Sequence, residues 1–322
     1  MNVLVVIVNY KTPVLAIDCL ESLAAADGLP ADSRVVVTDN LSPDDSVARI
    51  QTAIDEHGWS KWAKLMPLPR NGGFAYGNNE AIRPALLDRD RPDYVLLLNS
   101  DTRVYPGAIR TLVEFLQSHP EAGMVGSRLE DPDGTCQFST FRFPSFWSEM
   151  DESLRLGPLH RLLKDRVTLV PTPAEAAPVD WVAGASLLIR REVFDTIGLL
   201  DDGFFLYYEE TDFCLRAARA GFPCWYEPKS RVMHLIGQST GVTVRGQALP
   251  RRPKYWFDSR RRYFLRNHGA MFTALLDAMW AVTYPFGRLQ LGLRRKPVFD
   301  PRRFWLDYVA NSVFRRGFGL SR

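Results

Sequence analysis

The stretch VLVVIV, Val3–Val8, is a continuous run of branched apolar residues. Such a run is typical of a parallel β-strand buried on both faces, because a half-exposed strand would alternate apolar and polar residues. RVVVT, Arg34–Thr38, and DYVLLL, Asp93–Leu98, are similar runs, and a shorter one covers Lys64–Leu68. Asn78–Leu87 is expected to be a helix. Strands that alternate with helices over the first hundred residues predict an open, mostly parallel α/β sheet flanked by helices.

The pattern becomes irregular after this sheet. Residues 135–178 contain several prolines and aromatic residues and are expected to form loops and short helices. Val179–Ile189 is expected to be one strand, and Arg190–Ile197 a short helix. Beyond Gly241 the composition changes to Arg, Trp, Tyr and Phe, so we place a domain boundary between residues 244 and 245.

Length and composition set bounds on the class of protein. The chain has 322 residues, 46% hydrophobic and 24% charged, which is the composition of a globular protein with a sizeable core. Its four cysteines are scattered and show no zinc-type spacing, so we expect a reduced, cytoplasmic setting. The N-terminal apolar run has no basic lead, and no stretch reaches 18 uninterrupted apolar residues. Neither a signal peptide nor a membrane span is therefore expected.

Polar side chains follow the predicted strands, at Asn9, Asp39, Asn71 and Asp101. Ligands of open parallel sheets bind outside the carboxyl ends of the strands, so a site is expected at this edge. One polar residue there is ordinary turn chemistry, whereas four at a common edge favour a ligand site. The stretch NGGFAYGNN, Asn71–Asn79, adds glycines that let a ligand approach the backbone closely. It lacks the G-x-G-x-x-G dinucleotide pattern and indicates only a generic nucleotide loop.

Asn99-Ser100-Asp101 directly follows the run LLL, so Asp101 emerges from a rigid strand end. A hard cation such as Mg²⁺ or Mn²⁺ prefers carboxylate oxygens and often takes only one or two of them, with substrate phosphates as further ligands. Asp101 suits that role, and a turn-capping aspartate is the alternative. His234, at the expected strand end SRVMHL, is either a structural histidine or a second metal ligand.

The stretch FFLYYEETDFCLR, Phe204–Arg216, places three carboxylates next to bulky apolar residues, where helical spacing begins. The helix dipole favours acidic residues in a first turn, and Asp212 can pair with Arg216 four residues later. At least one of Glu209 and Glu210 is then left without a structural role. A carboxylate in partly apolar surroundings has a raised pKa and is a better base near neutral pH, which makes one of them a candidate general base.

In series, these segments resemble the family-two inverting glycosyltransferases, which have the GT-A fold. The resemblance covers residues 3–241 and rests on motifs in the family's order: VVIVNYKT, VVVTDN, NGGFAYGNN, LLLNSDT, DWVAGASLLIRREVFDTIG, FFLYYEETDFCLRAARAG and VMH. Within the family, the chain looks like the bacterial branch that includes rhamnosyltransferases of cell-wall and O-antigen assembly, and the segment YWFDSRRRYFLRNHG contributes to this likeness. The resemblance implies a Rossmann-like, nucleotide-sugar-binding half in residues 1–105 and an acceptor and catalytic half in residues 106–244.

The resemblance also implies roles for individual residues. Asp39 and Asn71 would contact the nucleoside of a donor, a dTDP- or UDP-sugar. Asp101, the last position of an Asp-x-Asp-like motif, would bind the Mg²⁺ or Mn²⁺ that bridges the diphosphate, and His234 would complete the metal site. The expected donor site comprises Asn9, Asp39, Asn71, Gly73, Asn78, Asn99 and Asp101.

On the acceptor side, Glu210 matches the catalytic base, and Trp181 and Gly184 would border the acceptor sugar. The sequence departs from the family pattern twice. Asn99 stands where the first Asp of Asp-x-Asp is expected, and Glu210 stands where an Asp is frequent, so Glu209 stays an alternative base. The implied reaction is one displacement that inverts the anomeric carbon, such as transfer of rhamnose from dTDP-rhamnose to a lipid-linked or polysaccharide acceptor.

Residues 245–322 carry seventeen Lys or Arg and four Asp or Glu, a net charge of +13, so the rest of the chain carries −10. Basic clusters bracket the apolar segment 269–287, which Asp277 interrupts and Pro285 is expected to end. We expect a helical region on an anionic membrane surface, with the enzyme peripheral to the inner membrane. A basic surface packed on the catalytic domain is the alternative. No nucleic-acid motif is present, so no nucleic-acid partner is expected.

Two other functions fit part of the pattern. A nucleotidyltransferase also uses an α/β sheet and a metal-bound aspartate, and it would release pyrophosphate. A non-catalytic sugar-nucleotide-binding membrane protein would bind a donor without turnover. Binding an anionic diphosphate gains nothing from an unpaired glutamate nearby, which argues against this second alternative.

Overall fold

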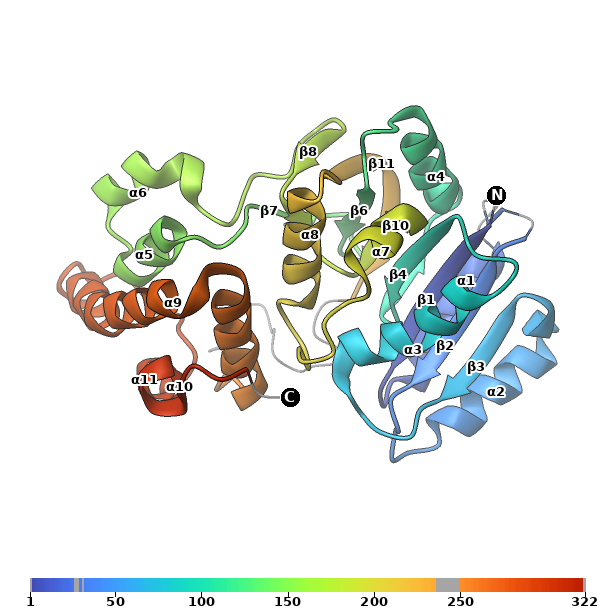
Figure 1. The fold of residues 1–322 in the computed structure, drawn as a ribbon, viewed down its shortest axis with the longest axis horizontal. Helices are drawn as coiled ribbons and strands as arrows, with labels where there is room; N and C mark the ends of the chain where they lie inside the picture. The colour runs from blue at the N-terminus through green and yellow to red at the C-terminus, as the bar shows by residue number, and fades with distance from the viewer. Residues whose placement is uncertain (1, 26–28, 31, 236–249, 321–322) are drawn as a thin grey trace.

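The computed structural model describes residues 2–25, 29–30, 32–235 and 250–320. These residues form one large mixed sheet with helices on both faces, and a helical lobe beside it that contains the C-terminal part of the chain (Figure 1). The predicted α/β architecture is confirmed. The predicted boundary between residues 244 and 245 lies outside the described residues and stays a prediction.

The central sheet has nine strands, of which eight form one continuous order and β8 pairs with β11. The order is β3 (Ala63–Pro67), β2 (Arg34–Asp39), β1 (Val3–Asn9), β4 (Tyr94–Asn99), β10 (Ser186–Arg190), β6 (Met124–Glu130), β11 (Cys224–His234) and β5 (Thr102–Val104), with β8 at Ala177–Val179. The first four strands are parallel, as predicted, and β10 runs antiparallel between β4 and β6. A separate two-stranded sheet pairs β7 (Thr140–Phe141) with β9 (Trp181–Val182).

Helices cover both faces of the sheet, and β1 shows why its sequence is apolar throughout. Val3, Val5 and Ile7 pack into the core under α1 (Pro13–Ala25), α2 (Ser46–Glu56) and α4 (Ala108–Ser118). Leu4 and Val6 pack into a second core under α3 (Gly73–Leu87), α7 (Arg191–Ile197) and α8 (Glu209–Arg219). Successive side chains of a strand point to opposite faces, so a strand buried on both sides has no position for a polar residue.

Two predicted element boundaries among the first two hundred residues are wrong. α3 begins at Gly73 instead of Asn78, so NGGFAYGNN forms mainly the first turns of a helix and not a loop. This early start has a tertiary cause, because the Phe74 backbone N–H donates to the carbonyl of Phe205, 2.9 Å away. Val179–Ile189 is not one strand: it is divided among β8, β9 and β10, which pair with three different parts of the fold.

The C-terminal lobe is built around α9 (Lys254–Leu293), which packs against α5 (Phe146–Leu154) and α10 (Phe304–Asn311) (Figure 1). α6 (Gly157–Leu163) and α11 (Val313–Arg316) complete it, and single 3₁₀ turns lie at Trp59–Lys61 and Lys164–Arg166. α9 bends at Gly269, whose φ of 83° is not helical. Among the described residues, no helix combines the length and the hydropathy that a membrane crossing requires.

Pro285 does not end this helix, contrary to the prediction. A proline inside a helix has no N–H to donate to the carbonyl four residues earlier, which is that of Ala281. The indole N–H of Trp305 donates to this carbonyl at 2.9 Å. The lost backbone hydrogen bond is therefore replaced by one from a side chain that is distant in sequence.

Several of the basic side chains of the lobe form ion pairs in its interior. Arg260 is 4% exposed and contacts Glu149 at 2.7 Å and Asp277 at 2.9 Å. Asp277, which was expected to interrupt an apolar surface, is buried at the centre of this cluster and also accepts a hydrogen bond from Tyr308. The lobe is attached to the rest of the fold by the same chemistry, since Arg262 of α9 pairs with Asp201 at 2.7 Å.

Candidate active site

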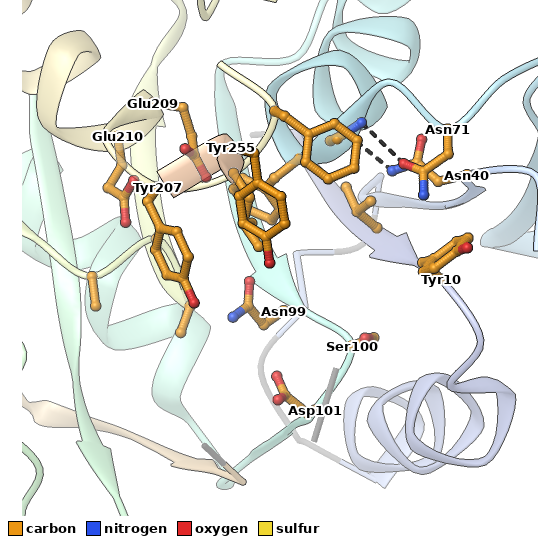
Figure 2. A pocket seen from close by; sticks show the side chains of 18 of the residues that line it. Tyr10, Asn40, Asn71, Asn99, Ser100, Asp101, Tyr207, Glu209, Glu210 and Tyr255 are labelled. Carbon is orange, nitrogen blue, oxygen red and sulfur yellow. Dashed lines mark hydrogen bonds between the residues drawn. The ribbon is translucent and has the colours of Figure 1, made fainter. Parts of the chain in front are cut away.

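A cavity of about 440 Å³ opens at the carboxyl ends of β1 and β4 (Figure 2). Its lining combines polar strand-end residues, aromatic side chains and three carboxylates. The lining residues are Val8, Tyr10, Asn40, Asn71, Gly73, Phe74, Asn99, Ser100, Asp101, Ala183, Gly184, Ala185, Phe205, Leu206, Tyr207, Glu209, Glu210, His234 and Tyr255. No Lys or Arg is among them in the described part of the chain. This pocket is therefore acidic.

The pocket brings together eight of the residues singled out from the sequence: Asn71, Gly73, Asn99, Asp101, Gly184, Glu209, Glu210 and His234. Four others lie outside its lining. Asn9 and Asp39 are buried behind it, where Nδ2 of Asn9 donates to Oδ2 of Asp39 at 2.7 Å. Asn78 is buried within α3, and its amide donates to the Phe74 carbonyl. Trp181 stacks on Phe141 with ring centroids 4.2 Å apart.

Asp101 and His234 lie side by side, with His234 Nε2 3.5 Å from Asp101 Oδ1. Gln137 orients the imidazole: its amide nitrogen donates to the backbone carbonyl of His234 and to Asp131, so its Oε1 faces His234 Nδ1 at 3.2 Å. Nδ1 must then carry the proton, which leaves the lone pair of Nε2 directed toward Asp101. Asn99 Nδ2 lies 3.4 Å from the same Nε2. A carboxylate and an imidazole lone pair are suitable donors for a divalent cation.

No group of three or more His, Cys, Asp or Glu that could hold a metal by itself occurs in the described residues. The arrangement offers two protein ligands. That number suits Mg²⁺ or Mn²⁺ when substrate phosphates provide the remaining ligands, and it does not suit a structural ion held by protein alone.

Glu209 and Glu210 begin α8 and face the same pocket. Burial raises the pKa of Glu209 well above its usual range, and the neighbouring Glu210 carboxylate raises it further. Burial also raises the pKa of Glu210, opposed by backbone hydrogen bonds that include one from Gly184. Oε2 of each glutamate is buried without a hydrogen-bond partner in the described structure. Glu209 is only 3% exposed, whereas Glu210 is less deeply buried, so Glu210 is the more accessible of the two from the pocket.

The third acid of the stretch has a structural role. Asp212 is fully buried and pairs with Arg216 at 2.8 Å, as the four-residue spacing predicted. It also accepts a hydrogen bond from the amide of Asn267 in α9, 2.8 Å away. Asp212 is therefore fully engaged, and the two glutamates are the free acids of this turn.

The backbone before α8 is held in a strained form that aims the glutamates. Tyr207 and Tyr208 both have φ of 70°, a left-handed conformation that non-glycine residues rarely adopt. The segment is fixed to the start of α3, where a Cβ added to Gly73 would lie 1.8 Å from the Phe205 carbonyl oxygen. Only glycine fits this contact, which joins the start of α3 to the turn before the two glutamates.

Sequence reasoning missed the aromatic part of the pocket. Tyr255, from α9, stacks on Tyr207 with centroids 6.3 Å apart and contacts Phe205 at 5.2 Å, so the C-terminal lobe supplies part of the pocket wall (Figure 2). Asn40 was also missed; its amide donates to the Gly73 carbonyl at 3.0 Å. The adjacency of aromatic residues to the acids in FFLYYEE was a signal for Tyr207, whereas no sequence signal related Tyr255 to the site.

The class of fold is established by comparison with solved structures. The chain is similar to a mannosyltransferase from Pyrobaculum calidifontis solved in complex with GDP-Man and Mn²⁺, with a TM-score of 0.56 and 16% identity over 91% of this chain and 74% of that one. At this identity the likeness establishes the fold, which is of the GT-A type.

The family follows from the sequence. Residues 1–248 match the model of the glycosyltransferase-like family 2, and the chain belongs to that family. It is 30% identical, over 69% of its length and 72% of the relative's, to an N-acetylglucosaminyl-diphospho-decaprenol L-rhamnosyltransferase of Mycobacterium tuberculosis. It is 22% identical, over 68% and 69% of the two lengths, to a dTDP-rhamnosyl transferase of Shigella flexneri. The family confirms the expected resemblance and favours glycosyl transfer over the two alternative functions.

Proposed function

We propose that the protein transfers rhamnose from dTDP-rhamnose to a hydroxyl group of a lipid-linked acceptor, with a divalent metal ion and with inversion at the anomeric carbon. The observation that carries this proposal is one pocket in which Glu209 and Glu210 share the lining with Asp101 and His234. The carboxylates can accept a proton from the acceptor, and the Asp101–His234 pair suits a metal-bound diphosphate. The donor and acceptor classes are supported by the names of the relatives: one is a dTDP-rhamnosyl transferase, and the other is an L-rhamnosyltransferase named for N-acetylglucosaminyl-diphospho-decaprenol.

The charge of the pocket supports metal dependence. A nucleoside diphosphate is an anion. The described lining of this pocket contains no Lys or Arg, and its acids include Asp101 and Glu210, whereas the raised pKa of Glu209 favours its uncharged form. Like charges in a partly buried site repel strongly, so the donor needs a cation with it. Asp101 and His234 would hold Mg²⁺ or Mn²⁺, which when bound neutralises the charge that develops on the departing diphosphate.

Glu210 is proposed as the base. It takes the proton from the acceptor hydroxyl group as the acceptor oxygen forms a bond to the anomeric carbon. The bond between that carbon and the diphosphate oxygen breaks in the same step, and its electron pair leaves with the nucleoside diphosphate. Attack opposite to the leaving group inverts the configuration, and no covalent enzyme intermediate is required.

The remaining proposed roles divide along the chain. Asn71, Gly73 and Asn99 would bind the donor in the half formed by residues 1–105, with Asn9, Asp39 and Asn78 supporting it from behind the pocket. Gly184 would border the acceptor sugar: a Cβ built there would lie 3.7 Å from Glu210 Oε1, so an added side chain would occupy the space beside the base. Trp181, in β9, would also border the acceptor sugar.

The test is release of nucleoside diphosphate from UDP-, dTDP- and GDP-sugars, with Mg²⁺ or Mn²⁺ and an extract of lipid-linked acceptors. Wild type is compared with Glu210→Gln and with the matched neighbour variant Glu209→Gln. We expect metal-dependent release of dTDP from dTDP-rhamnose, lost in Glu210→Gln while donor binding persists. Loss in Glu209→Gln alone would move the base to Glu209. Donor binding without release under any condition would contradict the proposed function.

A further inference from the structure

The second half of α9 has two apolar faces, and only one of them is covered. The inner face, which includes Leu276, Trp280 and Tyr284, packs against the rest of the lobe and is buried. The outer face is exposed to solvent by between 56% and 79% per side chain. Its members, here called the outer stripe, are Met271, Leu275, Val282, Phe286, Leu289 and Leu293.

The outer stripe is continuous along the helix. Its spacings of three, four and seven residues place every member on one side of α9. Of the 22 large apolar side chains exposed in the described residues, 13 lie between Met271 and Leu320. Single exposed apolar residues are normal on a protein surface, whereas a contiguous group of this kind marks an interaction surface.

The charge around the stripe is positive. Between residues 271 and 320 the three acids are all turned inward: Asp277 pairs with Arg260, Asp300 with Arg288, and Asp307 with Arg251. The exposed basic residues in the same interval, here called the basic rim, have no acidic partner within the described structure. They are Arg294, Arg295, Lys296, Arg302, Arg303, Arg315 and Arg316.

This division separates the two roles of the basic C-terminal region. The guanidinium groups of Arg260 and Arg262 form internal ion pairs and are not available to a distant surface, and the more exposed Arg266 is paired with Asp201. The basic rim begins directly after α9, continues with Arg302 and Arg303 just before α10, and ends with Arg315 and Arg316 in α11. Both α10 and α11 pack against α9. An exposed apolar stripe edged by unpaired cations is the arrangement of a helix that lies in the plane of an anionic bilayer.

We propose that the outer stripe and the basic rim together dock the protein on an anionic lipid bilayer, with α9 lying at the level of the lipid headgroups. A second copy of this chain fits the surface less well, because pairing two stripes would bring two cationic rims together. The same helix carries Tyr255 at the pocket, so the docking surface is linked through one element to the active site. The inference extends the proposed function, whose lipid-linked acceptor would reside in that bilayer, but it rests on a surface outside the pocket.

The test is co-sedimentation with vesicles of phosphatidylcholine alone or with phosphatidylglycerol, in the absence of donor and acceptor. The stripe variant is Val282→Gln/Phe286→Gln/Leu289→Gln. Its matched control is Val14→Gln/Phe138→Gln/Leu87→Gln, which changes the same three residue types at exposed positions elsewhere. We expect wild type and the control to bind the anionic vesicles and the stripe variant to bind at least tenfold more weakly. The rim variant Arg294→Gln/Arg295→Gln/Lys296→Gln should bind the anionic vesicles more weakly than wild type. Added salt should also weaken the vesicle binding of wild type, because it screens the cations of the rim.

A second measurement reports which face meets the lipid. Cysteines 19, 214 and 224 are buried, so Val282→Cys in a Cys136→Ser background offers one accessible thiol for an environment-sensitive fluorophore. We expect a blue shift on adding anionic vesicles, and none for Leu87→Cys in the same background. Equal vesicle binding by wild type and the stripe variant would overturn the proposal. So would a wild-type dimer that the stripe variant converts to monomer without any change in vesicle binding. Because no sugar transfer is measured, these results are independent of the proposed reaction.

Discussion

His234 donates from Nδ1 to Oε1 of Gln137, 3.2 Å away, and this contact fixes which nitrogen of the ring faces Asp101. Gln137 is 3% exposed, and its own amide group is held by the His234 carbonyl and by Asp131. The orientation of the imidazole, on which the proposed metal site depends, is thus set by a residue outside the pocket lining.

Gln137→Ala should weaken metal binding without removing a ligand. Residues that orient a ligating histidine typically contribute about 10- to 100-fold to metal affinity. We expect the Mn²⁺ concentration for half-maximal activation to rise by that factor, and Mn²⁺ binding measured by electron paramagnetic resonance with nucleoside diphosphate to weaken in parallel. Gln51→Ala, on the exposed side of α2, is the control. Unchanged Mn²⁺ binding would show that Gln137 only fills space.

The rate should depend on pH through Glu210. Burial raises its pKa above the ordinary value of 4.5, and a base works in its deprotonated form. We therefore expect kcat to fall as pH decreases through this raised pKa and to level off above it. Glu210→Gln should lower kcat by about 10²- to 10⁴-fold, and its residual activity should no longer show this fall at low pH (the acid limb of the profile). Glu209→Gln should retain the acid limb. An acid limb that persists in Glu210→Gln would contradict the assignment.

Glu209→Gln should stabilise the protein at neutral pH. The folded-state pKa of Glu209 is raised, so between 4.5 and that value the folded protein holds a proton that the unfolded chain releases. The free energy of unfolding therefore falls as pH rises through this interval, and an uncharged side chain avoids the loss. We expect a gain of about 1–3 kcal/mol at pH 7.5, measurable as a higher Tm, and no gain below pH 4.5. Glu56→Gln, at an exposed position, is the control; an equal gain at both pH values would point to another cause.

Gly73→Ala should destabilise the protein by more than the strain of its positive φ alone would cause. Gly73 and Gly58 both have positive φ, but an added Cβ meets the Phe205 carbonyl at 1.8 Å in the first case and nothing within 4 Å in the second. Gly58→Ala should lose about 1–2 kcal/mol of stability from φ alone. Gly73→Ala should lose more and also reduce kcat/KM, because the strained turn that aims the glutamates must move. If denaturant unfolding gave equal losses of stability for Gly73→Ala and Gly58→Ala, the contact with the Phe205 carbonyl would have adjusted to the added Cβ at no cost.

Arg260→Ala should destabilise the C-terminal lobe strongly. It leaves Glu149 and Asp277 buried without their partner, and breaking one side of a buried ion pair costs about 3–5 kcal/mol. Arg302→Ala, on the exposed rim, should change stability by about 0.5 kcal/mol or less. Urea unfolding of both variants measures the difference. A loss below about 1 kcal/mol for Arg260→Ala would show that the cluster does not hold the lobe together.

The central sheet and the position of its site could be predicted from sequence because both depend on local patterns. Runs such as VLVVIV predict doubly buried strands, and polar residues at their ends must meet at one edge of a parallel sheet. The spacing from Asp212 to Arg216 likewise predicted their ion pair, which the structure contains. Asn9 and Asp39, which are not in the pocket lining, lie side by side at the ends of neighbouring strands.

The sequence by itself determined the fold class, the family and the acidic residues of the pocket, because each follows from short local motifs and from their order along the chain. Only the tertiary structure decided which cations of the basic region are internal, since Arg260 and Glu149 are 111 residues apart and neither predicts the other. It also brought Tyr255 to the pocket and turned the outer stripe of α9 toward solvent. The sequence shows that a helix is apolar and needs a partner surface. Which of its faces the rest of the protein buries, and which stays exposed, depends on how elements distant in sequence pack against it.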